Sequence, residues 1–327
     1  MEIFDVFLQN LLSPAILFFV LGIVAGFLKS DLNVPDQISR YLAIYLMMAI
    51  GFKGGVAIAE TPEINIQIIL AIVAGIITGF TQPFIGYALL RYTTKLDKAT
   101  AAAVSAHYGS ISMVTFVTAV SFLNANEVVY AGYIVAILAL MEAPAILTGL
   151  FIAHKAEPQT IKSSEKATPR LTKEIFTNGA ILLLTGSFLI GWISGTGGMQ
   201  KMHGFLVEPF QGILAFFLLD MGLVVSREMQ HLKEFNFKLI IFGIYMPLIS
   251  SLVGLTISWA IGLDVGTGFL FTVLIASASY IAVTAAMRLA LPQAKAAIYI
   301  PMTLAITFPF NVAIGIPLYF SIAQKIL

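Results

Sequence analysis

The chain has 327 residues, of which 59% are hydrophobic and 11% are charged, and its formal net charge is +1. Soluble globular domains carry about 45–50% apolar and about 25% charged residues, so this composition excludes an ordinary soluble protein and indicates a membrane protein. The small net charge argues against nucleic acid as a partner, because such a partner requires a concentrated basic surface. The lack of cysteine excludes disulfides, thiolate nucleophiles and cysteine metal sites.

Long apolar runs separated by Pro, Gly and charged clusters predict an all-α protein with ten transmembrane helices, because a spanning helix needs about 20 mainly apolar residues. In chain order the predicted spans cover residues 13–28, 40–59, 66–90, 98–121, 127–153, 176–195, 205–226, 236–262, 266–290 and 295–324. Residues 1–12 contain no Lys or Arg. They therefore lack the basic segment of a signal peptide, and we expect the first helix to be retained.

The distribution of basic residues predicts the orientation, because short loops rich in Lys and Arg stay on the cytoplasmic side. If the N-terminus lies outside, every Lys and Arg except Lys53, Lys201 and Lys325 falls in an inner loop or at the inner end of a span. The opposite orientation reverses this bias. We therefore expect both termini outside and the polar segment 154–174 inside.

The two halves of the chain show a weak repeat with an offset of about 167 residues. Three pairs of short matches carry it: Leu96-Asp97-x-x-Thr100 with Leu263-Asp264-x-x-Thr267, Ser110-x-x-x-Val114-Thr115 with Ser279-x-x-x-Val283-Thr284, and Ile50-Gly51 with Met221-Gly222. Because each copy holds an odd number of spans, the second copy must enter the membrane upside down, as in many secondary transporters. The predicted domains are a first repeat at 1–153, a cytoplasmic linker at 154–174 and a second repeat at 175–327.

Small and hydroxylated residues interrupt two predicted spans at mid-depth, at residues 105–112 in the fourth and 276–280 in the ninth. Unwound backbone at this depth is tolerated only where it is buried in protein or lines a wet cavity. Half-helices that start at such breaks direct the positive ends of their dipoles at the same place, which suits a small anion. The predicted anion site comprises Gly109, Ser110, Ile111, Ser112, Ser277, Ala278, Ser279 and Tyr280. Close helix packing through small residues is the alternative interpretation.

Glu142 is the clearest ionisable residue inside a predicted span. A carboxylate at the centre of a bilayer costs about 2.5–3.5 kcal/mol on the insertion scale, so it should face a cavity or a cation. Asn311 holds the comparable place in the tenth span. With the hydroxyls of Thr115 and Thr307, these oxygen ligands predict a site for sodium, a hard cation. A hydrogen-bonded structural Glu and an Asn at a proline kink are the alternative.

Two further polar residues lie inside predicted spans. We expect His107 to be packed and hydrogen-bonded rather than to relay protons, and we expect Asp220 to make a polar contact in the outer half of the membrane.

Four stretches of the chain closely resemble the SbtA family of sodium-dependent bicarbonate transporters of cyanobacteria. They are Ser13-Pro14-Ala15-Ile16-Leu17-Phe18-Phe19, Ile50-Gly51-Phe52-Lys53-Gly54-Gly55, Ser105-Ala106-His107-Tyr108-Gly109-Ser110-Ile111-Ser112 and Met141-Glu142-Ala143-Pro144. The resemblance spans essentially the whole chain. It implies ten spans in two inverted five-helix repeats, similar in plan to the bile-acid sodium symporters, with a gate domain of spans 1, 2, 6 and 7 and a core domain of spans 3–5 and 8–10.

The same resemblance implies sodium as the coupling ion, the bacterial inner membrane as the location and a role in concentrating inorganic carbon. It also implies a homotrimer and regulation on the cytoplasmic face by the PII-like protein SbtB, which senses adenine nucleotides. The linker at 154–174 departs from the family, whose linkers are longer.

We therefore expect a symporter that imports bicarbonate with sodium by alternating access, and not an enzyme. A sodium-coupled carrier of a larger organic anion is disfavoured because the two breaks contain no Arg or Lys and few aromatic residues. An intramembrane hydrolase with Ser110 as nucleophile lacks the Gly-x-Ser-x-Gly elbow. A passive channel needs a continuous polar stripe, which the spans do not contain.

Overall fold

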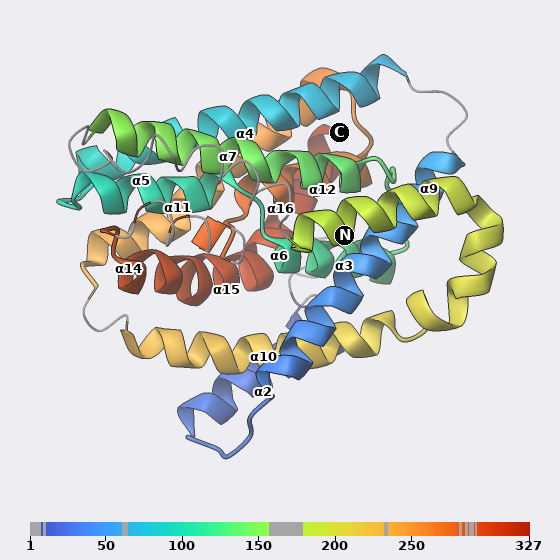
Figure 1. The fold of residues 1–327 in the computed structure, drawn as a ribbon, viewed down its shortest axis with the longest axis horizontal. Coiled ribbons are helices and arrows are strands. Elements are labelled where there is room, and N and C mark those ends of the chain that lie inside the picture. The colour runs from blue at the N-terminus through green and yellow to red at the C-terminus, as the bar shows by residue number, and fades with distance from the viewer. Residues whose placement is uncertain are drawn as a thin grey trace.

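The computed structural model describes residues 8, 11–60, 65–156, 179–231, 235–280, 283, 284, 287, 291 and 293–327. These residues form helices and no strands (Figure 1). Within them, eight helical segments are long and apolar enough to cross a membrane, and two shorter apolar helices accompany them. The chain is therefore a multi-pass helical membrane protein.

The helices follow the predicted spans closely. The first half contains α2 (Pro14–Phe27), α3 (Asp36–Ala59), α4 (Ile66–Thr93), α5 (Lys98–Gly109), α6 (Met113–Ala125) and α7 (Ile134–Ala156). The second half contains α9 (Gly179–Leu206), α10 (Phe210–His231), α11 (Phe237–Ile261), α12 (Val265–Ala276), α14 (Ala296–Pro301), η2 (Met302–Thr307), α15 (Phe308–Phe310), η3 (Asn311–Gly315) and α16 (Ile316–Ile326). The predicted linker begins inside α7 and otherwise lies outside the described residues.

Two predicted boundaries are wrong for local backbone reasons. The fifth span starts at Ile134 rather than at 127, because the chain first turns at Glu127, whose φ is 56°. The sixth span does not end at 195 but continues to Leu206 through a kink at Gly195, which has φ 53° and ψ −152°. Glycine adopts positive φ at little cost, so the chain bends there and resumes a helix.

The helices form two groups of neighbours. In one group α3 packs along α9 and α2 along α10, and these four helices occupy the lower and right part of Figure 1. In the other group α4 packs on α5 and α7, and α11 packs on α12. Backbones approach closely in the first group, since a Cβ on Gly22 of α2 would overlap the Leu219 carbonyl oxygen of α10. Small residues allow such approach between membrane helices.

The last span is irregular. Its segments η2 and η3 are π-helical, and Pro301, Pro309 and Pro317 interrupt the backbone hydrogen bonding along it. π-helical turns are rare and often occur at functional sites. This span carries Thr307 and Asn311 to the centre of the molecule, where both side chains are buried.

Candidate substrate-binding site

The first break separates α5 from α6. The carboxylate of Asp97 caps α5 by accepting the amide of Thr100 at 2.8 Å, and the helix ends at Gly109. Ser110 is extended, with φ −101° and ψ 167°. Ser112 then caps α6, because its Oγ accepts the amide of Thr115 at 3.2 Å. The interruption that the sequence predicts is thus present, and it runs from the end of α5 at Gly109 to the Ser112 cap of α6.

The second break follows α12 and repeats this geometry. Asp264 caps α12 by accepting the amide of Thr267 at 2.9 Å. α12 has 12 residues, as α5 does, and ends before an extended Ser277 with φ −91° and ψ 171°. Ser110 therefore corresponds to Ser277, and the predicted match of Ser110 with Ser279 is wrong. The ends of α5 and α12 determine which residues of the two halves correspond. The Val-Thr pairs used for the predicted match lie beyond these helix ends.

The two breaks are in direct contact. The amide of Ser112 donates to Oγ of Ser277 at 2.8 Å, and the amide of Ser279 donates to the carbonyl of His107 at 2.9 Å. Each break thus satisfies a backbone group that the other break frees. Unwound backbone inside a membrane requires such partners.

The Ser110 side chain differs from its surroundings. It is 1% exposed, and its Oγ has no hydrogen-bond partner among the residues that the structure describes. A buried hydroxyl without a partner is unfavourable by about 1–3 kcal/mol. A ligand that accepts or donates one hydrogen bond at this point would remove that cost.

A cavity of about 950 Å³ reaches the crossing. Ile111 and Ser112 of the first break and Ser279 and Tyr280 of the second line one side of it. α3, α9 and α10 form the other side with mostly apolar residues. The remaining predicted site residues, Gly109, Ser110, Ser277 and Ala278, are buried behind this wall rather than on it.

The structure places the predicted sodium ligands at different points around the breaks. Thr115 donates its hydroxyl to Oγ of Ser112 at 2.9 Å in the first break. Asn311 donates from Nδ2 to the carbonyl of Ala276, at the end of α12, at 2.9 Å. Thr307 instead bonds the hydroxyl of Tyr108 at 2.6 Å and lies behind the last turn of α5.

The side chain of Glu142 lies outside the described part of the structure. The structure therefore brings Thr115 and Asn311 to the two breaks, but the four-residue sodium set stays a prediction.

A family model described as the Na⁺-dependent bicarbonate transporter superfamily matches residues 14–324. The chain belongs to this superfamily. It is accordingly a transporter and not an enzyme, and the resemblance seen in the sequence is confirmed at the level of the family. No curated protein sequence gives a significant match to the chain.

Gln82, which the sequence analysis did not single out, lies beside the second break. Its Nε2 donates to the carbonyl of Ile275 at 2.7 Å and to Oγ of Ser250 at 2.5 Å, while its buried Oε1 has no partner. Gln82 thus joins the middle of α4 to the last turn of α12. The available signal was a lone amide before Pro83 in a long apolar run.

His107 is packed and hydrogen-bonded, as expected for a structural histidine. Its Nδ1 pairs with the carbonyl of Ala103 at 2.7 Å and its Nε2 with Oγ1 of Thr284 at 3.1 Å. Its ring stacks on Tyr299, with the ring centroids 4.6 Å apart. Both ring nitrogens are thus used within the transporter, which leaves neither in line for a proton path.

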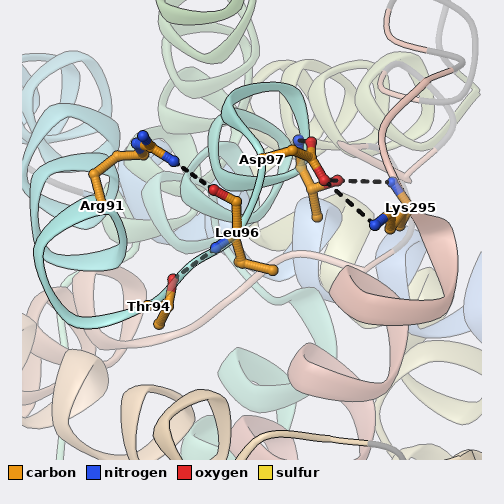
Figure 2. A network of polar contacts seen from close by, with 6 residues as sticks. Arg91, Thr94, Leu96, Asp97 and Lys295 are labelled. Atoms are coloured by element: carbon orange, nitrogen blue, oxygen red, sulfur yellow. Dashed lines mark hydrogen bonds and ion pairs between the residues drawn. The ribbon is translucent and has the colours of Figure 1, made fainter.

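Each half of the transporter anchors the start of the other half's broken span. Oγ1 of Thr100 accepts the amide of Lys295 at 3.1 Å, and Oγ1 of Thr267 accepts the amide of Ala131 at 2.8 Å. Figure 2 shows the first anchor, where Nζ of Lys295 also lies 3.7 Å from the carboxylate of Asp97. The guanidinium of Arg91 donates to the carbonyl of Leu96 beside it. The two broken spans are thus held at matching ends by segments distant in sequence.

Proposed function

We propose that this transporter is a symporter that moves bicarbonate inward together with sodium by alternating access. The observation that carries the proposal is the contact between the two breaks, with the buried hydroxyl of Ser110 in the first break unpaired among the described residues. The superfamily supplies bicarbonate as the substrate class and sodium as the ion on which transport depends.

The chemistry of the breaks suits one monovalent anion. The N-terminus of α6 faces the crossing, and helical structure resumes after the second break at residues 283 and 284. Each half-helix contributes roughly half a positive charge at its N-terminus, so two of them balance one negative charge without Lys or Arg. We assign the bicarbonate oxygens to the amides and hydroxyls of residues 109–112 and 277–280.

Sodium completes the site in this proposal. The oxygens of Thr115, Thr307, Asn311 and Glu142 are hard ligands of the kind that alkali cations prefer. A bound sodium ion offsets the Glu142 carboxylate and lies close to the anion, which couples the two substrates. Glu142→Gln is therefore expected chiefly to raise the sodium concentration that gives half-maximal uptake.

The two groups of helices support division into a moving core and a gate. We assign α2, α3, α9 and α10 to the gate and the other helices to the core, as two inverted repeats. The cavity between them extends to Ser39 and Arg40 near the start of α3. Near the other end of α3 the two groups are in contact, since a Cβ on Gly132 would overlap Ala57.

With both termini outside, the start of α3 is cytoplasmic, so this arrangement is inward-facing. A single cysteine at Met47, which lines the cavity, tests this in a chain without native cysteine. We expect an impermeant thiol reagent to label it from the cytoplasmic side and not from outside. Labelling only from outside would contradict the assignment.

The location and partners follow the resemblance. We propose a homotrimer in the bacterial inner membrane that binds the PII-like protein SbtB on its cytoplasmic face. Co-purification of a small trimeric PII-like protein that responds to adenine nucleotides supports this, whereas no binding at low salt with any nucleotide contradicts it.

The size and apolar walls of the cavity favour one alternative, a sodium-coupled carrier of another, larger organic anion. Uptake of labelled bicarbonate into proteoliposomes distinguishes the two. We expect uptake with sodium outside, little uptake with potassium, and weak competition by excess organic carboxylates. Equal uptake with potassium would refute sodium coupling, and strong competition by a larger carboxylate would favour the alternative substrate.

A further inference from the structure

Asp220 of α10 is a buried carboxylate that the proposed transport site does not use. It is 2% exposed, and its Oδ2 is buried without a hydrogen-bond partner. Among the residues that the structure describes, no Lys or Arg forms an ion pair with it. The negative charge of this side chain is therefore not balanced by a direct contact within the described protein.

The surroundings of Asp220 place it beside the transport cavity. The hydroxyl of Ser39, on α3, lies near the carboxylate, and Ser39 itself lines the cavity. Phe217, Met221 and Val224, on the same side of α10, line it as well. Ser39 lies in the first turn of α3. On the predicted topology Asp220 therefore lies toward the cytoplasmic half and not in the outer half, where the sequence placed its polar contact.

The second break contacts α10 close to this side chain. The hydroxyl of Tyr280, in the second break, donates to Sδ of Met221 at 3.8 Å, one residue from Asp220. Asp36 and Arg227 are the other charged groups whose fields act on the carboxylate. An ionised, unbalanced Asp220 would repel an anion that leaves the crossing through this cavity.

We propose that the Asp220 carboxylate and the Ser39 hydroxyl bind a sodium ion at the edge of the cavity, between α3 and α10. A carboxylate and a hydroxyl are hard oxygen ligands suited to an alkali cation, and the cavity provides room for water to complete the coordination shell. This site is separate from the one predicted around Glu142 and Asn311. It rests on the proposed function in that sodium is the coupling ion.

The role of this second site follows from its position. A sodium ion at Asp220 neutralises the carboxylate, which removes the repulsion between this wall and the departing anion. The ion then occupies a binding site on the route to the cytoplasm. Occupancy therefore links the release of the cation to the release of the anion.

Binding of ²²Na⁺ to the purified, detergent-solubilised protein without bicarbonate tests the site directly. We expect Asp220→Asn to weaken one class of sodium site by about tenfold or more, because a charged ligand is lost. Ser39→Ala is expected to weaken the same class less. Asp31→Asn, which changes an exposed carboxylate between α2 and α3, is the matched control and should bind as the unmodified protein does.

Wild-type ²²Na⁺ binding by Asp220→Asn would overturn the proposal. If that variant does not fold, Ser39→Ala decides, and unchanged binding by it overturns the proposal equally. A change confined to the pH dependence of transport would mean that Asp220 takes up a proton instead of sodium, which also overturns it. Failure of the proposed function would give a different result from failure of this second site. The unmodified protein would then take up bicarbonate without requiring sodium.

Discussion

The first break and the second begin with the same local geometry but use their equivalent serines differently. Ser277 donates to the carbonyl of Leu274 at 2.9 Å and accepts the amide of Ser112 at 2.8 Å, so its hydroxyl is fully engaged in holding the crossing. Ser110 is equally buried and has no partner. The comparison teaches that equivalent positions in the two halves have separated into a structural serine and a serine available to a ligand.

The largest expected effect on stability comes from changing the residue that precedes each serine. Gly109 precedes Ser110, and a Cβ there would overlap the ring of Pro83, whereas the equivalent Ala276 already carries a Cβ. Gly109→Ala is expected to force α4 and α5 apart and to destabilise the protein by about 1–3 kcal/mol. The reverse change, Ala276→Gly, should cost about 0.5–1 kcal/mol. Thermal unfolding in detergent measures both, and equal shifts would mean that the two helix ends are interchangeable.

The serines themselves provide the sharpest test. Ser277→Ala leaves the buried amide of Ser112 without an acceptor and should lower stability by about 1–3 kcal/mol. Ser110→Ala removes no contact within the protein, so its unfolding temperature should not fall. Its bicarbonate affinity should instead weaken by roughly 5- to 150-fold, which corresponds to one lost hydrogen bond in a buried site.

The measurements are thermal unfolding and the bicarbonate dependence of uptake, made on protein that reaches the membrane normally. If Ser110→Ala transports with unaltered sodium and bicarbonate dependence, the crossing is only helix packing. A fall in stability equal to that of Ser277→Ala would also contradict the comparison.

Two tyrosines form hydrogen bonds behind the breaks, and removing their hydroxyls should have a smaller effect on stability. Tyr108 bonds Thr307 behind the first break, and Tyr319 donates to Oδ1 of Asn311 behind the second at 2.9 Å. Tyr108→Phe and Tyr319→Phe should each lower stability by about 0.5–1.5 kcal/mol. Tyr319→Phe should also alter the sodium dependence of uptake, because it frees an oxygen of Asn311. Tyr45→Phe, which removes a hydrogen bond to the carbonyl of Phe205, serves as the control. Identical uptake curves would argue against Asn311 as a sodium ligand.

The sequence predicted the broad fold because membrane spans leave long apolar runs, and it predicted both breaks because small and hydroxylated residues interrupt those runs. It also contained the correct register. The Asp97 and Asp264 motifs are helix caps, and their offset equals that of Ser110 and Ser277. The predicted match of Ser110 with Ser279 failed because it relied on Val-Thr pairs that follow the breaks. There the offset between the two halves differs from the offset of the helix caps.

Other features depend on contacts that a linear pattern does not contain. The role of Gln82 arises only when α4 meets the end of α12, more than half the chain later. The importance of Asp220 depends on α3 bringing Ser39 beside it. The π-helical turns of the last span reflect how Thr307 and Asn311 reach their partners in the packed protein rather than any local preference.

The paired anchors of the broken spans also constrain the order of events during synthesis. The hydroxyl oxygen of Thr100 accepts the amide of Lys295, which lies 195 residues later in the chain. At a synthesis rate of about 5–20 residues per second, α5 therefore waits roughly 10–40 s for this anchor after it leaves the ribosome. During that interval the first half has its helices but not its finished crossing. The crossing of the two breaks is thus one of the last parts of the molecule that the nascent chain can complete.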